Sequence, residues 1–164
     1  MEKVKQNVKE LNIAVSKGDV KKIEELIKKG VDVNARDQGG FTALYGAVFK
    51  GKIESVKALI KGGIEVNARD CEGCTALHYA SMTEDGIVVE LIKSGADTNA
   101  RDSCGNIPLH EAVAMGKEKN VKALISGGAD VNIENNIGLK AKDIADIRKF
   151  ENIVEVLKNM EKKC

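Results

Sequence analysis

The chain has 164 residues, of which 43% are hydrophobic and 31% are charged, so it can bury one compact core and is neither a disordered nor a membrane-embedded protein. Its 26 lysines and arginines nearly balance its 25 aspartates and glutamates, which excludes a global field that would draw it to nucleic acid or to an anionic membrane. Its apolar runs, such as 58–60 and 87–89, are far shorter than the ~20 residues that cross a bilayer.

The first residues and the cysteines predict the compartment. Residues 1–9 alternate charged and apolar side chains and lack the apolar segment of about 7 to 15 residues that a secretory signal contains. The four cysteines, Cys71, Cys74, Cys104 and Cys164, are too few and too unevenly spaced for a disulfide framework. We therefore expect the chain to stay in the reducing cytoplasm.

From the N-terminus onward, the sequence repeats itself at a nearly constant spacing. Gly30, Gly63, Gly95 and Gly128 are separated by 33, 32 and 33 residues. The same register is kept by asparagine at 34, 67, 99 and 132 and by leucine at 11, 44, 77 and 109. A period of this length indicates a repeat architecture in which each unit packs on the next.

Each unit contains two short helical patterns. In the second unit, Leu44, Ala47 and Val48 predict one amphipathic helix, and apolar residues at 56, 59 and 60 predict another after an intervening glycine. Thr42 is predicted to cap the first helix, and the glycines at 62 and 63 are predicted to close the second. The polar stretch 65–73 then predicts a turn-rich connection to the next unit.

Four short motifs carry a resemblance to a known family. Gly-Ala-Asp occurs at 95–97 and 128–130, Val-Asn-Ala-Arg-Asp at 33–37 and 66–70, Thr-Ala-Leu-His at 75–78 and Ile-Pro-Leu-His at 107–110. This pattern resembles the ankyrin repeat, a unit of about 33 residues that combines a β-turn with two helices. The resemblance implies an all-α repeat solenoid of about five stacked ankyrin repeats, each a helix-turn-helix with a β-hairpin loop.

The repeats are expected within a single domain of residues 1–164, at about 5–36, 37–69, 70–101, 102–134 and 135–160. The first unit begins with charged residues, and the last has Lys140, Lys142 and Asp143 where the signature would stand. Polar residues at such places are typical of terminal repeats that face water. We therefore expect the first and last units to act as caps and the chain to be a monomer.

The third unit is one residue short between Ala80 and Val88. Its residues 82–85, Met-Thr-Glu-Asp, stand where the other units have a glycine, such as Gly51, between the two helices. One interpretation is a tolerated deletion in a loop. The other is a local reshaping of the binding face.

The signature histidines are expected to have a structural role. His78 and His110 occupy one position in consecutive units, and Tyr45 replaces them in the second unit, so titration at this position is dispensable. The resemblance implies that these imidazoles bridge neighbouring loops through hydrogen bonds. No serine or cysteine lies in a nucleophile motif, and the glycines do not form a phosphate loop. We therefore expect neither enzymatic activity nor a cofactor.

Cys71, Cys74 and Cys104 offer an alternative function. A gap of two residues lets Cys71 and Cys74 approach one metal ion, and Cys104 lies at the tip of the next hairpin. A structural zinc site needs four ligands, and the fourth would have to be His78 or His110. A metal- or redox-responsive protein is therefore the alternative to three ordinary surface thiols.

The resemblance also implies where a partner would bind. In the family, partners contact the positions that flank the turn glycine and those just before the inter-helix glycine, on an extended concave face. Mapped onto this chain, the partner-binding residues are Gln38, Phe41, Phe49, Lys50, Glu72, Cys74, Met82, Thr83, Ser103, Asn106 and Met115.

Aromatic residues make up only 3% of the chain, so the positions of Phe41, Tyr45 and Phe49 at helical spacing are informative. One interpretation is a stripe of core residues. The other is an interface anchor, because the fold leaves positions 41 and 49 exposed and exposed aromatics beside methionine are typical of interfaces. We hypothesise that Phe41, Phe49, Met82 and Met115 form the apolar centre of the binding surface.

The lysines of the second helices are predicted to coat the opposite, convex side. A solvated face is the ordinary interpretation of such a pattern, and nucleic-acid binding with a steep salt dependence is the alternative. These lysines are Lys21, Lys22, Lys28, Lys57, Lys61 and Lys122.

The sequence therefore predicts a non-enzymatic protein-protein interaction module that acts as an adaptor, an inhibitor or a scaffold. We expect another protein as its partner, and neither nucleic acid nor a membrane. The abundance of lysine, asparagine and isoleucine indicates an AT-rich genome. Since ankyrin proteins are frequent in intracellular bacteria, delivery into a host cell as an effector is a further hypothesis.

Overall fold

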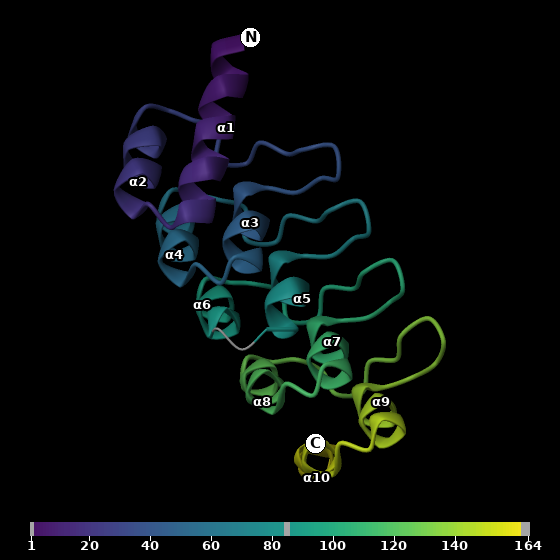
Figure 1. Cartoon of the computed structure of the whole chain (residues 1–164). Helices are drawn as coiled ribbons and strands as arrows, with labels where there is room; N and C mark the ends of the chain where they lie inside the picture. The colour runs from purple at the N-terminus through teal and green to yellow at the C-terminus, as the bar shows by residue number, and fades with distance from the viewer. Residues whose placement is uncertain (1, 84–85, 162–164) are drawn as a thin grey trace.

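The computed structural model describes residues 2–83 and 86–161. Within these ranges the chain forms ten helices and no strand, so the expected hairpins are irregular loops (Figure 1). No described helix is long and apolar enough to cross a membrane. The helices are α1 (Glu2–Lys17), α2 (Val20–Lys28), α3 (Ala43–Phe49), α4 (Ile53–Lys61), α5 (Ala76–Ser81), α6 (Ile87–Lys93), α7 (Pro108–Ala114), α8 (Glu118–Ser126), α9 (Ala141–Arg148) and α10 (Glu151–Glu161).

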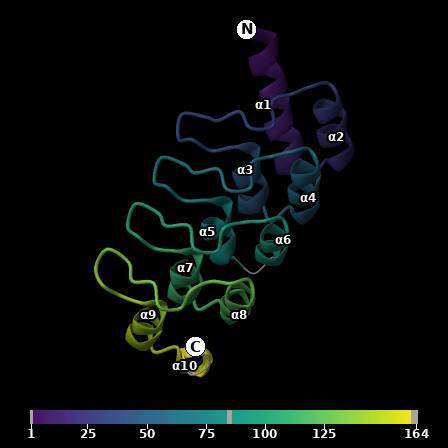
Figure 2. The same cartoon turned by 180° about the vertical axis from the view of Figure 1, so that it is seen from behind.

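The described helices form five consecutive pairs, from α1 with α2 to α9 with α10. The odd-numbered helices contact one another in one row, and the even-numbered helices form a second row beside it. Loops project from the odd-numbered row on the side away from the even-numbered one (Figures 1 and 2). We call the surface made by the odd-numbered helices and these loops the inner face, and the surface of the even-numbered helices the outer face.

Each pair buries its own apolar stripe. In the second pair, Leu44 and Val48 of α3 and Val56 and Leu59 of α4 are each at most 1% exposed. The helical spacing of these residues in the sequence is thus confirmed. Helices this short are marginal on their own in water, so packing within and between the pairs stabilises them.

One polar side chain organises each loop before the next odd-numbered helix begins. Oδ1 of Asp37 accepts hydrogen bonds from the backbone N–H groups of Gly39 and Phe41, both at 2.9 Å. Asp70, Asp102 and Asn135 accept the equivalent bonds in the three later loops. The turn-rich connection that the sequence predicts is therefore confirmed.

Asparagine side chains tie each loop to its neighbour. The side-chain amide of Asn34 donates to the backbone oxygen of Gly63 at 3.4 Å and accepts from the backbone N–H of Glu65 at 2.7 Å. Asn67 and Asn99 make the same pair of bonds to the next loop along. Each contact reaches only the adjacent unit, which is the nearest-neighbour pattern of a repeat solenoid.

Thr42 occupies the predicted N-cap position of α3, but its side chain does not form the hydrogen bond that usually caps a helix. Thr42 precedes α3 with extended backbone angles, φ of −97° and ψ of 172°, but its hydroxyl makes no capping hydrogen bond. In the next unit the hydroxyl of Thr75 lies 3.0 Å from Nδ1 of His78. Tyr45 replaces that histidine in α3 and has no such nitrogen, so the Thr42 hydroxyl is buried without a partner among the described residues.

The turns inside the pairs require a left-handed backbone. Gly18, Gly51 and Gly116 have φ angles of 78°, 60° and 66°, a region that glycine enters without steric cost. Between α9 and α10 the same place is taken by Lys149, with a φ of 59°. Among the described residues, no other non-glycine has a positive φ.

The irregular third turn lies between α5 and α6. Met82 and Thr83 follow α5, and Gly86, with a φ of 79°, directly precedes α6. Glu84 and Asp85 lie outside the described residues. A tolerated deletion and a reshaped binding face therefore both stay predictions.

Candidate protein-binding surface

Four aromatic side chains meet on the inner face, and we call them the aromatic cluster. Phe41 comes from the loop before α3, Tyr45 and Phe49 come from α3, and Tyr79 comes from α5. The ring centroid of Tyr79 lies 5.5 Å from that of Tyr45, 6.2 Å from that of Phe41 and 6.4 Å from that of Phe49. The Phe41 and Tyr45 centroids are 5.0 Å apart. Such ring pairs stabilise by about 0.5–1.5 kcal/mol beyond burial alone, so the cluster is held in place before any partner arrives.

The aromatic cluster has a buried base and an exposed edge. Tyr45 is only 4% exposed, and its hydroxyl donates to the backbone oxygens of Ala68 at 2.9 Å and Cys74 at 2.6 Å. Phe41 is 36% and Phe49 is 76% exposed. Tyr45 therefore belongs to the core, whereas Phe49 projects from it, and the role of Phe49 as an interface anchor stays a prediction.

Sequence reasoning missed Tyr79. This residue occupies the helix position that Gly46 has in α3 and Glu111 has in α7. Its hydroxyl donates a 2.7 Å hydrogen bond to Oδ2 of Asp70, and burial, with this carboxylate, raises the pKa of Tyr79. The sequence signal that could have identified Tyr79 is its type: it is a large aromatic at a position where the neighbouring units carry a glycine and a carboxylate.

An apolar hollow of about 470 Å³ opens between α1 and α3 beside the aromatic cluster. Gly46 contributes to its lining, because the helix position that carries Ile13 in α1 and Tyr79 in α5 has no side chain there. Phe41 and Phe49 line the same hollow. Its remaining lining residues are Asn12, Val15, Asp37, Thr42, Ala43 and Tyr45.

Three carboxylates follow the aromatic cluster along the inner face, and we call Asp70, Asp102 and Glu111 the acidic row. Cys74 lies near all three: burial and then their negative charges raise the pKa of its thiol to about 11. Burial and then the charge of Asp102 raise the pKa of Glu111, whose Oε1 accepts a 3.3 Å hydrogen bond from the side-chain amide of Asn106. Within the described chain, no lysine or arginine forms an ion pair with the acidic row.

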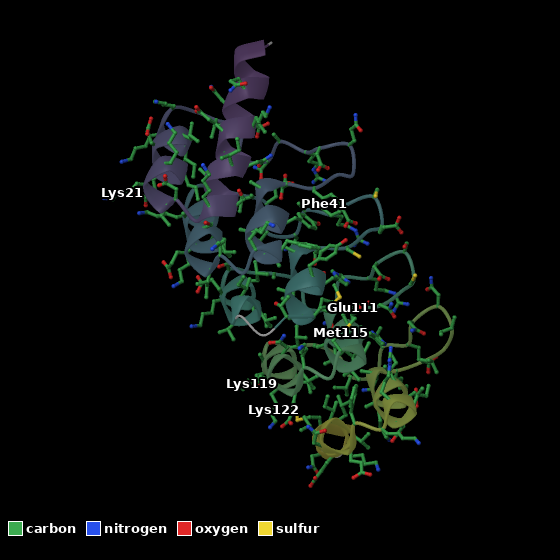
Figure 3. All side chains as sticks on the ribbon, viewed as in Figure 1. Lys21, Phe41, Glu111, Met115, Lys119 and Lys122 are labelled. Atoms are coloured by element: carbon green, nitrogen blue, oxygen red, sulfur yellow. The ribbon has the colours of Figure 1, made fainter. Side chains whose placement is uncertain are left out.

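The lysines predicted on the second helices lie on the outer face. Figure 3 shows Lys21, Lys119 and Lys122 on the even-numbered helices, opposite Phe41 and Glu111 on the side of the loops. Several outer lysines pair with acids of their own helix, as in Lys57 with Glu54 at 2.7 Å and Lys122 with Glu118 at 2.5 Å. The outer face therefore carries charges of both signs, and its lysines are partly neutralised on their own helices.

Apart from Phe41 and Phe49 of the aromatic cluster, the residues predicted to bind a partner fall into three groups. Gln38, Glu72 and Ser103 are exposed near the loop tips, Cys74 and Asn106 are half-buried farther along the loops, and Lys50, Met82, Thr83 and Met115 follow the ends of α3, α5 and α7. Of the four apolar residues proposed as a centre, Phe41 and Phe49 are brought together by Tyr79. Met115 is 50% exposed, but α5 lies between its helix and α3.

The signature histidines bridge neighbouring loops, as the resemblance implied. Nε2 of His78 lies 3.2 Å from the backbone oxygen of Asn106, and Nε2 of His110 lies 3.2 Å from that of Leu139. The Tyr45 hydroxyl makes the equivalent bond in the second unit. Burial lowers the pKa of both imidazoles, which suits a structural group that stays neutral.

The cysteine alternative finds no support in the described part of the chain. No three His, Cys, Asp or Glu side chains there lie close enough to hold a metal ion. Cys71, Cys74 and Cys104 are free thiols, and the raised pKa of Cys74 disfavours the reactive thiolate. His78 and His110, which could supply a fourth metal ligand, instead contact the neighbouring loops through Nε2. Cys164 lies outside the described residues.

The chain was compared with known proteins. A family model described as ankyrin repeats in three copies matches residues 11–102 and 82–163, and together these ranges cover the loops, the aromatic cluster and the acidic row. No curated protein matches the chain significantly. Ankyrin repeats are protein-protein interaction modules and typically scaffolds rather than enzymes. The chain belongs to the ankyrin repeat family.

Proposed function

We propose that this protein is a non-enzymatic binding module that holds a partner protein against its inner face, which corresponds to the concave face of the family, and against its loop tips. It acts by occupancy, as an adaptor, an inhibitor or a scaffold. The observation that carries this proposal is Phe49, a large aromatic that is 76% exposed yet packed against Tyr79. Its burial by a partner would contribute about 1.5–3 kcal/mol.

The surroundings of Phe49 support the same function. Interface hot spots are enriched in aromatic side chains surrounded by more polar contacts. Here the exposed loop residues Gln38, Glu72 and Ser103 provide polar groups on one side, and Lys50 and Thr83 follow the helix ends on the other. The aromatic contacts hold Phe41 and Tyr79 in place, so little side-chain entropy remains to be lost on binding.

The proposal includes a cytoplasmic monomer with a polar cap at each end. The free thiols of Cys71, Cys74 and Cys104 favour a reducing compartment. In the last pair, Asp143 accepts a 2.8 Å hydrogen bond from the backbone N–H of Lys140, so polar groups replace the signature at that end. Polar terminal repeats keep a solenoid from stacking on another copy.

Affinity capture from a lysate of the cell that makes the protein tests the proposed function. The whole chain, a Phe41→Ala/Phe49→Ala variant and a Val89→Ala control are immobilised, and retained proteins are identified by mass spectrometry. Val89 is a matched control because it is an exposed apolar residue on the outer face. We expect the chain and the control to retain the same protein and the double variant to lose it.

The double variant must also be shown to fold, because Phe41 is partly packed. Circular dichroism and thermal unfolding serve this purpose, and Phe49→Ala alone provides a milder variant. Equal retention by all forms would contradict binding through the inner face.

A further inference from the structure

We propose that the inner face binds a partner segment in which an apolar side chain precedes or follows a lysine or arginine by about five or six residues. The apolar side chain enters the hollow between α1 and α3, and the basic side chain pairs with Glu111 and Asp102. This inference rests on the proposed function and adds the chemistry of the partner to it.

The hollow sets the first requirement. Its lining includes Val15, Phe41 and Phe49, so it favours an aromatic or large aliphatic side chain. Gly46 keeps it open, since a Cβ added there would lie 4.0 Å from Cγ1 of Val15 and would reduce the space above it. The Thr42 hydroxyl, which has no hydrogen-bond partner in the described chain, also belongs to the lining.

The acidic row sets the second requirement. Glu111 and Asp102 are half-buried and both bind Asn106, whose backbone N–H donates to Oδ1 of Asp102 at 2.8 Å and whose side-chain amide donates to Oε1 of Glu111 at 3.3 Å. Burial and then the negative charge of Asp102 raise the pKa of Glu111, and an incoming cation would offset the negative charge of this pair. Because no described lysine or arginine forms an ion pair with either carboxylate, charge complementarity favours a basic side chain.

The spacing follows from the row of odd-numbered helices. Glu111 is on α7, which contacts α5, and α5 contacts α3 beside the hollow. Packed helices lie about 8–10 Å apart, so two steps cover about 16–20 Å. An extended segment rises about 3.3 Å per residue, which gives about five or six residues between the apolar and the basic side chain. Figure 3 shows Phe41 and Glu111 on the same side of the molecule.

A library of random 12-residue peptides displayed on phage, selected on the whole folded chain, tests this inference. We expect selected peptides to share an aromatic or large aliphatic residue and a lysine or arginine at this spacing. An acidic consensus, an apolar consensus without a basic residue, or no selected peptide would overturn the proposal.

A selected peptide then serves as the probe in a double-mutant cycle measured by fluorescence anisotropy. Glu111→Gln keeps an oxygen that can accept the Asn106 bond, and we expect it to weaken binding about 10- to 100-fold, the range for a hydrogen bond to a charged group. The effect should vanish when the basic residue of the peptide is replaced by glutamine. Glu54→Gln, on the outer face, is the matched control and should leave binding unchanged.

The outcomes separate this inference from the proposed function. Binding of the captured partner that depends on Phe49 but not on Glu111 would overturn the inference and leave the inner face as the binding surface. Binding that depends on neither residue would overturn both. Binding that depends on both residues, with Glu54→Gln silent, supports both.

Discussion

The hydroxyl of Tyr79 donates a 2.7 Å hydrogen bond to Oδ2 of Asp70. This bond joins a ring of the aromatic cluster to the carboxylate that organises the preceding loop, because Oδ1 of Asp70 accepts from the backbone N–H groups of Glu72 and Cys74. The position of the ring and the shape of the loop are therefore set together.

Replacement of Tyr79 by phenylalanine should uncouple the position of the ring from the shape of the loop. Asp70 is only 8% exposed, so its carboxylate would lose a donor that water replaces poorly, and the free energy of unfolding should fall by about 1–2 kcal/mol. Urea unfolding measures this change. Binding through the inner face should persist because the ring remains, and a stability equal to that of the parent chain would refute the coupling.

Thr42→Val should stabilise the protein. The hydroxyl of Thr42 is buried without a hydrogen-bond partner among the described residues, and valine has nearly the same shape without the polar atom. We expect a gain of about 1 kcal/mol, read from the midpoint of urea unfolding. Thr75→Val is the matched control and should destabilise, since the Thr75 hydroxyl lies 3.0 Å from Nδ1 of His78.

Lys149→Gly should also stabilise the protein. The left-handed backbone of Lys149, with a φ of 59°, costs about 1–2 kcal/mol for a residue with a Cβ. Glycine removes that cost but loses more entropy on folding, which leaves a net gain of about 0.5–1 kcal/mol in thermal or urea unfolding. The reverse change, Gly116→Lys, should destabilise more strongly, because a Cβ there would lie 3.1 Å from the Phe150 ring.

Glu111→Gln should raise stability at neutral pH. Burial and the Asp102 charge raise the pKa of Glu111 above its ordinary value of 4.5, so above that pH the folded state binds more protons than the unfolded state, and this group's contribution to stability falls as pH rises. Glutamine is always neutral and avoids that loss. Thermal unfolding at pH 7 should favour the variant, and the difference should shrink toward pH 4; a constant difference would contradict this account.

His78 and His110 should give the opposite pH dependence. Burial lowers the pKa of both imidazoles below the ordinary value of 6.5, so their contribution to stability is complete above that pH and is lost as pH falls below it. Unfolding followed from pH 7.5 to 5.5 measures this slope. His78→Tyr, which copies Tyr45 of the second unit, should flatten it, and an unchanged slope would show that His78 does not titrate on unfolding.

The helices, the loops and the role of the histidines follow from the sequence because they depend on contacts that recur once per unit. Leu44, Val48, Asp37 and His78 each make a contact that is repeated at a fixed spacing. Thr42 is the N-cap of α3 as predicted, but its hydroxyl lacks a partner because that bond depends on the residue three places later, which in this unit is Tyr45. The sequence pattern therefore located the start of the helix correctly, but it did not predict the hydrogen bonding of the Thr42 side chain.

The site was only partly predictable. Phe41 and Phe49 are recognisable as exposed aromatics, but their contact with Tyr79 joins two units at positions where the repeats differ. The hollow at Gly46 depends on a missing side chain between α1 and α3, and the raised pKa of Glu111 depends first on its burial and then on the charge of Asp102. The aromatic contacts, the hollow and the environment of Glu111 all arise from the way neighbouring units pack on one another. The repeat period alone does not specify these contacts between units.

The asparagine contacts have a consequence for how the molecule opens. Since Asn34, Asn67 and Asn99 each hold only the adjacent loop, units can detach in sequence from an end while the remainder stays folded. The aromatic cluster spans the second and third pairs, whereas Glu111 belongs to the fourth. Fraying that starts at the C-terminal pair would thus reach Glu111 before the aromatic cluster, so a bound segment could lose its basic contact while its apolar anchor is still held.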